Sequence, residues 1–193
     1  MDMMQVLKMY AAGQRDFRHV DFREAQMADL HLPDACLRQA NLAQAQLSQS
    51  CLERADIQGS NLWRVNLSGA NLRWANLNRT VLIRACLERI NLFQASLVES
   101  DLRLALMQRS LLCQADFRHA DLSYADLTGA DLTGADLRYA TLVGTDLRGA
   151  RLAGARFAWS NMDRAHVHLP AVEARDLILG RPIDAAQIVF PPQ

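Results

Sequence analysis

Lysine, cysteine and aromatic residues are all scarce in this sequence, and neither sign of charge is in excess. Lysine occurs once, at Lys8, against twenty arginines, and the formal net charge is zero. A neutral chain has little electrostatic attraction for nucleic-acid phosphates, which disfavours a nucleic-acid-binding role. The four cysteines include no Cys-x-x-Cys pair, so the common zinc-site spacing is absent and a disulfide framework is not expected.

Long apolar runs are also missing. No stretch is long enough to span a bilayer, and Met1–Gly13 lacks the basic start and apolar core that mark a signal peptide. We therefore expect a cytoplasmic location with no membrane insertion. Half of the 193 residues are apolar, which is enough for one domain with a continuous core.

A five-residue repeat fills most of the chain. Every unit contains an apolar residue, and most also contain a small residue two places before it and an Asp or Asn directly before it, as in Ala125-Asp-Leu-Thr-Gly129; the remaining two residues are variable. We number these positions first to fifth, so third positions have residue numbers ending in 2 or 7. From Phe17 to Val167 all 31 third positions are apolar, with 22 Leu among them, and 19 of the matching first positions are Ala. The frame continues without an inserted or deleted residue.

A period of five fits neither an α-helix nor a flat strand, because neither would keep the apolar row on one side. The pattern predicts short segments that turn the same way in every unit and wind into a solenoid, with first and third residues inside. A small first residue leaves room for the Leu at each corner. The second-position Asp or Asn is expected to bond nearby backbone amides and to stack from coil to coil.

With this pattern the chain resembles the pentapeptide-repeat proteins over residues 15–169. The resemblance implies an all-β fold, a right-handed quadrilateral parallel β-helix with four units per coil and nearly eight coils. At a coil spacing of about 4.8 Å the rod would be roughly 37 Å long. The opening stretch Tyr10-Ala-Ala-Gly-Gln-Arg-Asp-Phe17 is similar to cyanobacterial members of the family, among them a regulator of heterocyst differentiation.

The two ends of the chain depart from the repeat. Residues 1–14 are predicted to form an N-terminal helical cap over the first coil, because apolar residues fall at helical spacing within Asp2–Ala12. These residues are Met3, Val6, Leu7 and Tyr10. Residues 170–193 are predicted to form a C-terminal cap or tail, with a second short helix at Ala171–Leu179.

No catalytic, cofactor or metal site is expected. The Asp and Gly residues recur with the repeat, so they indicate turns rather than acid–base pairs, calcium ligands or a phosphate-binding loop. His19 and His119 share a column but would lie five coils, roughly 24 Å, apart. His166 and His168 fall in the last unit, where a capping or exposed role is expected. Because a Leu-filled rod offers no concave pocket, we predict no enzyme activity and no small-molecule substrate.

Function on such a rod belongs to its surface, where large outward apolar residues interrupt the consensus in the third to fifth coils. They are Trp63, Trp74, Val81, Ile83, Phe93, Val98, Leu104, Leu106 and Leu111, set among Arg64, Arg73, Arg84, Arg103 and Arg109. With 20 residues per coil, Trp63, Ile83 and Leu104 fall on one face together with Tyr124. Trp74 and Phe93 fall on the opposite face.

Apolar and arginine side chains in one patch are typical of protein interfaces, although single exposed apolar residues also arise by drift. We predict that a partner-binding surface is formed by Trp63, Arg64, Trp74, Val81, Ile83, Arg84, Phe93, Arg103, Leu104 and Tyr124.

Three functions are compatible with this surface, and a non-enzymatic protein–protein interaction module, a regulator or adaptor with an unidentified partner, ranks first. The family resemblance implies a second, a duplex-DNA mimic that binds or protects DNA gyrase, which needs a strongly acidic rod. In this chain, residues 54–109 have a formal charge of +4, from eight Arg and four acidic residues, and residues 116–146 have a formal charge of −4, from two Arg and six Asp. The third is nucleic-acid binding through arginines and stacking aromatic rings. We expect a monomer or weak dimer, because the terminal segments hinder end-to-end pairing.

Overall fold

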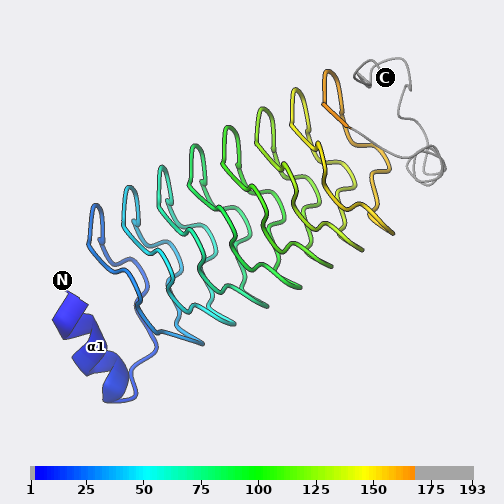
Figure 1. The fold of residues 1–193 in the computed structure, drawn as a ribbon. Coiled ribbons are helices and arrows are strands. Elements are labelled where there is room, and N and C mark those ends of the chain that lie inside the picture. Colours follow the sequence, from blue (N-terminus) through cyan, green and yellow to red (C-terminus); the bar gives the residue numbers. More distant parts are fainter. Residues whose placement is uncertain (1–2, 168–193) are drawn as a thin grey trace.

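The computed structural model describes residues 3–167 and shows one short helix followed by a rod of stacked coils (Figure 1). The helix, α1 (Met3–Ala11), lies at the N-terminal end of the rod, and the coils follow one another in sequence order. Second-position residues pair in parallel with the residue twenty positions later, from Asp16 with Cys36 to Asp146 with His166. Four units therefore make one coil, as the family resemblance implies.

Regular β-structure in the rod is limited to these single bridges. Among residues 3–167 no strand extends beyond one paired residue, because two of the five residues in each unit form a turn. The remaining residues are too few for an extended strand. The rod is thus built from ladders of single bridges that run along its length, in place of the longer strands of most β proteins.

Nearly every backbone amide of a unit has a defined partner. Second-, third- and fifth-position amides donate to carbonyls of neighbouring coils, as Leu62 N does to Val81 O at 2.8 Å. First-position amides close a turn, as Val65 N does to Leu62 O at 3.1 Å. The fourth-position amide is left for a side chain, and Trp63 N donates to Asn61 Oδ1 at 3.1 Å. This requirement explains the Asp or Asn at the second position.

The core is the row of third-position side chains. All of them, from Phe17 to Val167, are at most 5% exposed. Burying one Leu side chain stabilises the fold by about 1.5–3 kcal/mol, so this row dominates the stability of the rod. Hydroxyl groups at first positions find backbone acceptors, and Ser60 Oγ donates to Leu37 O at 2.6 Å. Inward Ser and Thr are therefore compatible with the core.

Every turn places its fifth-position residue in the left-handed region of backbone conformation. All thirty of these residues, 23 non-glycine and 7 glycine, have φ between +52° and +70°. None of them is Val, Ile or Thr, for which a positive φ is strongly unfavourable. Such residues do occur at the fourth position, including Ile83 and Val98. The turn geometry thus restricts the fifth position more strictly than the fourth.

Helix α1 spans Met3–Ala11 and lies within the predicted range Asp2–Ala12. Its Val6 side chain is fully buried and belongs to the same apolar cluster as the repeat core. The Tyr10 hydroxyl donates to Pro33 O at 2.7 Å, which ties the helix to the first coil. These contacts attach the helix to the rod through both apolar packing and a hydrogen bond.

The predicted tail at residues 170–193, including the helix expected at Ala171–Leu179, lies outside the described residues, as does His168. Within residues 3–167, no helix combines the length and the hydrophobicity that crossing a bilayer requires.

The turn geometry makes a testable prediction at two exposed or half-exposed glutamines. We expect Gln39→Val to lower the free energy of unfolding by about 1–2 kcal/mol, because Gln39 has φ +55° and a β-branched side chain clashes with the backbone there. The control Gln58→Val, at a fourth position, should change it by less than about 0.5 kcal/mol. Urea unfolding followed by circular dichroism measures both, and equal losses would contradict the turn assignment.

Candidate functional site

One face of the rod carries an open groove in the region predicted to bind a partner. We call the face formed by residues 61–64, 81–84, 101–104 and 121–124 the Trp63 face. Its groove has a volume of about 560 Å³, and its lining includes five of the predicted residues. The lining residues are Ile83, Arg84, Arg103, Leu104, Asp121, Ser123 and Tyr124. Residues from three successive coils therefore meet at one site.

The turns of these coils position the apolar side chains of the groove. Leu104 and Tyr124 occupy fifth positions of adjacent coils, where the left-handed turn directs side chains outward, and they are 42% and 59% exposed. The Tyr124 ring lies over Gly144, close enough that a Cβ atom on the glycine would fall 2.7 Å from it. Val81 stands at the second position of the same face and is 38% exposed.

The two arginines of the groove have different surroundings. Arg103 donates to both carboxylate oxygens of Asp101, at 2.8 and 2.7 Å, and lies 3.9 Å from Asp121. The hydrogen bonds that Arg103 donates to Asp101 raise the pKa of the Arg103 guanidinium. Arg84 forms no ion pair with any of residues 3–167, and its side chain is exposed. The groove thus combines a neutralised arginine with an uncompensated one.

Trp63 and Arg64 lie on the Trp63 face one coil before Ile83. The Arg64 guanidinium carbon is 4.7 Å from the centre of the Trp63 ring, a distance typical of a cation–π contact. Neither residue lines the groove itself. They extend the same face towards the N-terminal end of the rod.

Trp74 and Phe93 form a separate cluster on the opposite face, which comprises residues 71–74, 91–94, 111–114 and 131–134. Their ring centres are 6.0 Å apart in an edge-on arrangement, and the Arg73 guanidinium lies 4.4 Å from Trp74 and 5.1 Å from Phe93. Trp74 Nε1 also donates to Gln94 at 2.7 Å. The predicted residues therefore divide between two faces, and Arg73 is the member of this second cluster that the predicted set omitted.

The comparisons with known proteins identify the family. The family model for pentapeptide repeats, in eight copies, matches residues 21–59, 55–94, 95–134 and 130–167, which together cover most of the chain. The chain is a pentapeptide-repeat protein. Proteins of this family form right-handed quadrilateral β-helices, in agreement with the fold that the sequence implies.

Three solved structures illustrate the relationship. HetL, a protein involved in heterocyst differentiation regulation in the cyanobacterium Nostoc sp. strain PCC 7120, is 31% identical, with 86% of this chain and 94% of HetL covered and a TM-score of 0.28. A protein from the Arabidopsis thaliana thylakoid lumen is 28% identical over 56% of this chain and 74% of its own, with a TM-score of 0.36. QnrB1, a plasmid-mediated fluoroquinolone resistance protein, is 15% identical over 85% and 86%, with a TM-score of 0.46. No curated protein sequence matches the chain.

Four of the residues that the sequence predicts to be outward apolar groups are half-buried in the structure. They are Trp63, Ile83, Phe93 and Val98, all at fourth positions. By contrast, Trp74, Leu104 and Tyr124, at fifth positions, are exposed. Fourth-position side chains are more covered by neighbouring coils, so the accessible apolar surface of the groove is carried chiefly by Leu104 and Tyr124.

An aromatic stack absent from the predicted set lies towards the C-terminal end of the pentapeptide-repeat rod. His119, Tyr139 and Trp159 occupy the same fifth-position column on successive coils. Their rings are nearly parallel, with centres 4.9 Å apart for the first pair and 6.5 Å for the second. Column arithmetic at twenty residues per coil is sufficient to find this stack in the sequence.

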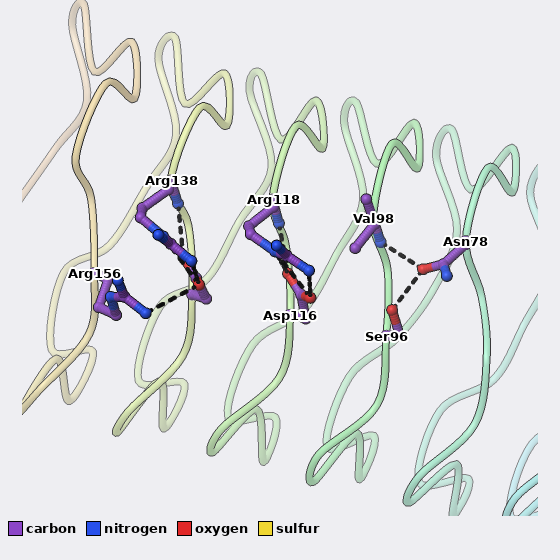
Figure 2. A network of polar contacts seen from close by, with 8 residues as sticks. Asn78, Ser96, Val98, Asp116, Arg118, Arg138 and Arg156 are labelled. Atoms are coloured by element: carbon purple, nitrogen blue, oxygen red, sulfur yellow. Dashed lines mark hydrogen bonds and ion pairs between the residues drawn. The ribbon is translucent and has the colours of Figure 1, made fainter.

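Figure 2 shows how side chains at the second position take part in hydrogen bonds on the face of the rod that carries this aromatic stack. Arg118 donates to Asp116 of its own unit through both its amide, at 3.1 Å, and its guanidinium, at 2.7 Å. Where Ser96 replaces the Asp, Asn78 of the preceding coil accepts from Ser96 Oγ at 2.6 Å and from Val98 N at 2.8 Å. A missing acceptor in one unit can thus be replaced by a residue of the neighbouring coil.

Arginine–aspartate pairs along the rod stabilise the charged form of the carboxylates. The hydrogen bond from Arg18 lowers the pKa of Asp16 to about 2. The hydrogen bond from Arg148 likewise lowers the pKa of Asp146. Within residues 3–167, no three His, Cys, Asp or Glu side chains are arranged to hold a metal ion.

The contact between Tyr124 and Gly144 can be tested with a matched pair of glycines. Gly144 and Gly149 have φ of +64° and +68°, but only backbone atoms of Gly129, at 3.9 Å, lie near a Cβ at Gly149. We expect Gly144→Ala to lower the unfolding free energy by about 0.5–1.5 kcal/mol more than Gly149→Ala, because the Tyr124 ring must leave its preferred rotamer. In a Tyr124→Asn background this difference should vanish. A difference that persists there would show that the Tyr124 ring is not its cause.

The lowered carboxylate pKa values predict acid sensitivity. A carboxylate whose pKa is lower in the folded state stabilises the fold above its unfolded pKa of about 3.9, and this contribution is lost as pH falls towards the folded pKa. The thermal midpoint should therefore fall as pH drops from about 4 towards 2. We expect a smaller fall of the thermal midpoint in Asp146→Asn, which has one such carboxylate fewer. The control Asp29→Asn should behave like the parent, because Asp29 forms no ion pair within residues 3–167. Circular-dichroism melts from pH 2 to 7 measure this, and identical profiles for all three proteins would refute it.

Proposed function

We propose that this pentapeptide-repeat protein is a non-enzymatic protein-binding module, a regulator or adaptor, that docks a protein partner on the groove of the Trp63 face. The proposal includes a right-handed rod of nearly eight coils with α1 as its N-terminal cap, a cytoplasmic location and a monomeric or weakly dimeric state. The observation that carries it is the groove itself, in which Ile83, Leu104 and Tyr124 from three coils line one site.

Exposed apolar groups at left-handed positions support a role beyond the fold. Leu104 and Tyr124 have φ of +59° and +58°, where Gly or Asn would be less strained. Their side chains are exposed to solvent, so the burial of apolar surface does little to offset this strain. Residues that break local rules without a structural gain are candidates for function.

Losses at the second position point in the same direction. Val81, Leu106 and Leu111 replace the Asp or Asn that would accept a hydrogen bond from the fourth-position amide. Within residues 3–167, the fourth-position amides of Ile83 and Gln108 have no other hydrogen-bond partner. Each lost hydrogen bond forgoes about 0.5–1.5 kcal/mol of stability. Val81 lies on the Trp63 face, and Leu106 lies on the next face around the coil. These two losses therefore adjoin the groove.

The regulatory part of the proposal draws on the relationship to HetL. HetL is involved in heterocyst differentiation regulation, and its identity to this chain extends over most of both proteins. A rod with an open apolar groove suits a role that consists of binding. The alternatives of gyrase protection and nucleic-acid binding require a strong charge of one sign, which this neutral chain does not have.

The test removes the apolar surface while preserving the turns. In the variant Val81→Asn/Leu104→Asn/Tyr124→Asn, each substitution restores a residue type that the backbone accepts more readily. We therefore expect unchanged or higher thermal stability, together with loss of the host proteins that the parent captures from lysate, identified by mass spectrometry. Loss of capture in this variant cannot then be attributed to unfolding.

The matched control removes two exposed aromatic rings elsewhere. Tyr139 and Trp159 are 49% and 60% exposed and also occupy fifth positions. The variant Tyr139→Asn/Trp159→Asn should keep the captured proteins. Capture that survives the groove variant, or that is lost equally in the control, would overturn the proposed docking site.

A further inference from the structure

We infer that the docking surface recognises an acidic peptide segment that carries an apolar anchor side chain. This inference rests on the proposed function and specifies the chemistry of its partner. The anchor would enter the groove between Leu104 and Tyr124, and carboxylates of the segment would meet the arginines beside it. The argument depends on which arginines of the rod lack a partner within the protein.

The arginines of the rod divide into compensated and uncompensated groups. Fourth-position arginines such as Arg118 pair with the Asp two residues earlier, and others pair with a carboxylate one coil away, as Arg54 does with Asp34 at 2.7 Å. Arg15, Arg64 and Arg73 lie over aromatic rings. Among the arginines of residues 3–167, only Arg84, Arg89 and Arg109 have neither an acidic nor an aromatic partner.

The three uncompensated arginines are neighbours on the folded rod. Arg84 lines the groove of the Trp63 face. Arg89 and Arg109 line a second depression, of about 320 Å³, on the next face around the coil. Arg84 and Arg89 are fifth-position residues of consecutive units, so they project from adjacent corners of one coil. The charges are thus concentrated beside the apolar groove and not scattered along the rod.

The columns of these residues bring like charges together. Twenty residues separate Arg64 from Arg84 and Arg89 from Arg109, so each pair occupies equivalent corners of adjacent coils, about 4.8 Å apart along the backbone. Like charges placed directly opposite one another on neighbouring β-segments destabilise the fold. Elsewhere in the same position the sequence alternates charge, as in Arg79 with Glu99 at 2.8 Å. A bound carboxylate between the arginines would relieve this repulsion.

Acidic groups around the second depression reduce this excess only in part. Asp126 accepts hydrogen bonds from Gln108, at 2.6 Å, and from Thr128. Glu88, which also lines the depression, is the one carboxylate there without a hydrogen bond or ion pair within residues 3–167. The two linings together hold four arginines against Glu88, Asp121 and Asp126, so the site has a formal excess of one positive charge (4 − 3). Arginine is suited to it, because its planar guanidinium binds carboxylates through two parallel hydrogen bonds.

An acidic peptide fits this surface better than a nucleic acid does. A nucleic acid would need a continuous row of cations along its backbone, whereas here the uncompensated arginines occupy two corners beside an apolar groove. A peptide can supply both a carboxylate and an apolar side chain within a few residues. Arginine and apolar anchors side by side are also the composition of energetically important protein-interface sites.

The experiment selects peptides from an unbiased random 12-residue library displayed on phage, using the full chain as bait. We expect the enriched peptides to carry net negative charge and at least one Leu, Ile, Phe or Trp. In fluorescence anisotropy, the best peptide should bind at least about tenfold more weakly to Arg84→Gln/Arg89→Gln/Arg109→Gln. The control Arg23→Gln/Arg118→Gln/Arg148→Gln removes the same charge from compensated arginines and should bind within about twofold of the parent.

The outcomes separate this inference from the proposed function. Enrichment of neutral or basic peptides, no enrichment, or equal losses in both arginine variants would overturn it. A single-stranded oligonucleotide that binds as tightly as the best peptide would also overturn it, in favour of a nucleic-acid partner. If host-protein capture is lost in the groove variant but survives in the variant of Arg84, Arg89 and Arg109, the docking function stands and the acidic partner does not. If capture survives in the groove variant, the docking function itself fails.

Discussion

The structure depends on hydrogen bonding between coils at a fixed separation of twenty residues. Three of the five amides in a unit donate to a neighbouring coil, one closes the turn and one is left for a side chain. This distribution holds only if every turn keeps its fifth residue at positive φ, as all thirty do. The backbone is therefore nearly invariant from unit to unit. Differences between one coil and the next reside almost entirely in side chains.

An invariant backbone explains why so much of this fold can be predicted from sequence. Once the unit is recognised, residue number decides whether a side chain is buried, and counting by twenty decides which residues share a column. The buried Leu row, the shared face of Ile83, Leu104 and Tyr124, and the opposite location of Trp74 all follow from that arithmetic. The stack of His119, Tyr139 and Trp159 follows from it too, but these residues lie outside the segment that departs most from consensus.

The features that could not be predicted depend on side-chain conformations. Whether Trp63 is exposed depends on how its ring lies against adjacent coils, which the repeat does not determine. Arg73 packs against Trp74 and Phe93 although its position in the unit equals that of Arg118, which binds its own Asp116 instead. The second position of the Arg73 unit is Asn71, whose amide cannot form an ion pair. A single neighbouring residue thus decides between a salt bridge and aromatic packing.

A repeat rod can tolerate local losses that a globular domain could not. Its stability is close to a sum of unit and neighbour contributions, so a unit that lacks an acceptor, such as that of Leu106, weakens only its own contacts. The flanking coils, with Thr and Asp in regular turns such as Thr128 and Asp126, compensate for the loss. Departures from consensus can therefore accumulate in the third to fifth coils while the rest of the rod keeps them in place.

The distribution of compensated charge also bears on the choice between possible partners. The acidic segment at residues 116–146 has a formal charge of −4, but the structure brings arginines from outside this segment to its carboxylates. Asp131 lies 3.3 Å from Arg151 and Asp146 pairs with Arg148, while Asp136 is contacted by Arg156 at 3.5 Å (Figure 2). Duplex DNA presents about one uncompensated charge per 1.7 Å of its axis. These neutralised carboxylates do not reproduce such a row. Within residues 3–167, the three arginines that have neither an acidic nor an aromatic partner adjoin the groove, which favours an acidic protein partner over a partner that binds DNA.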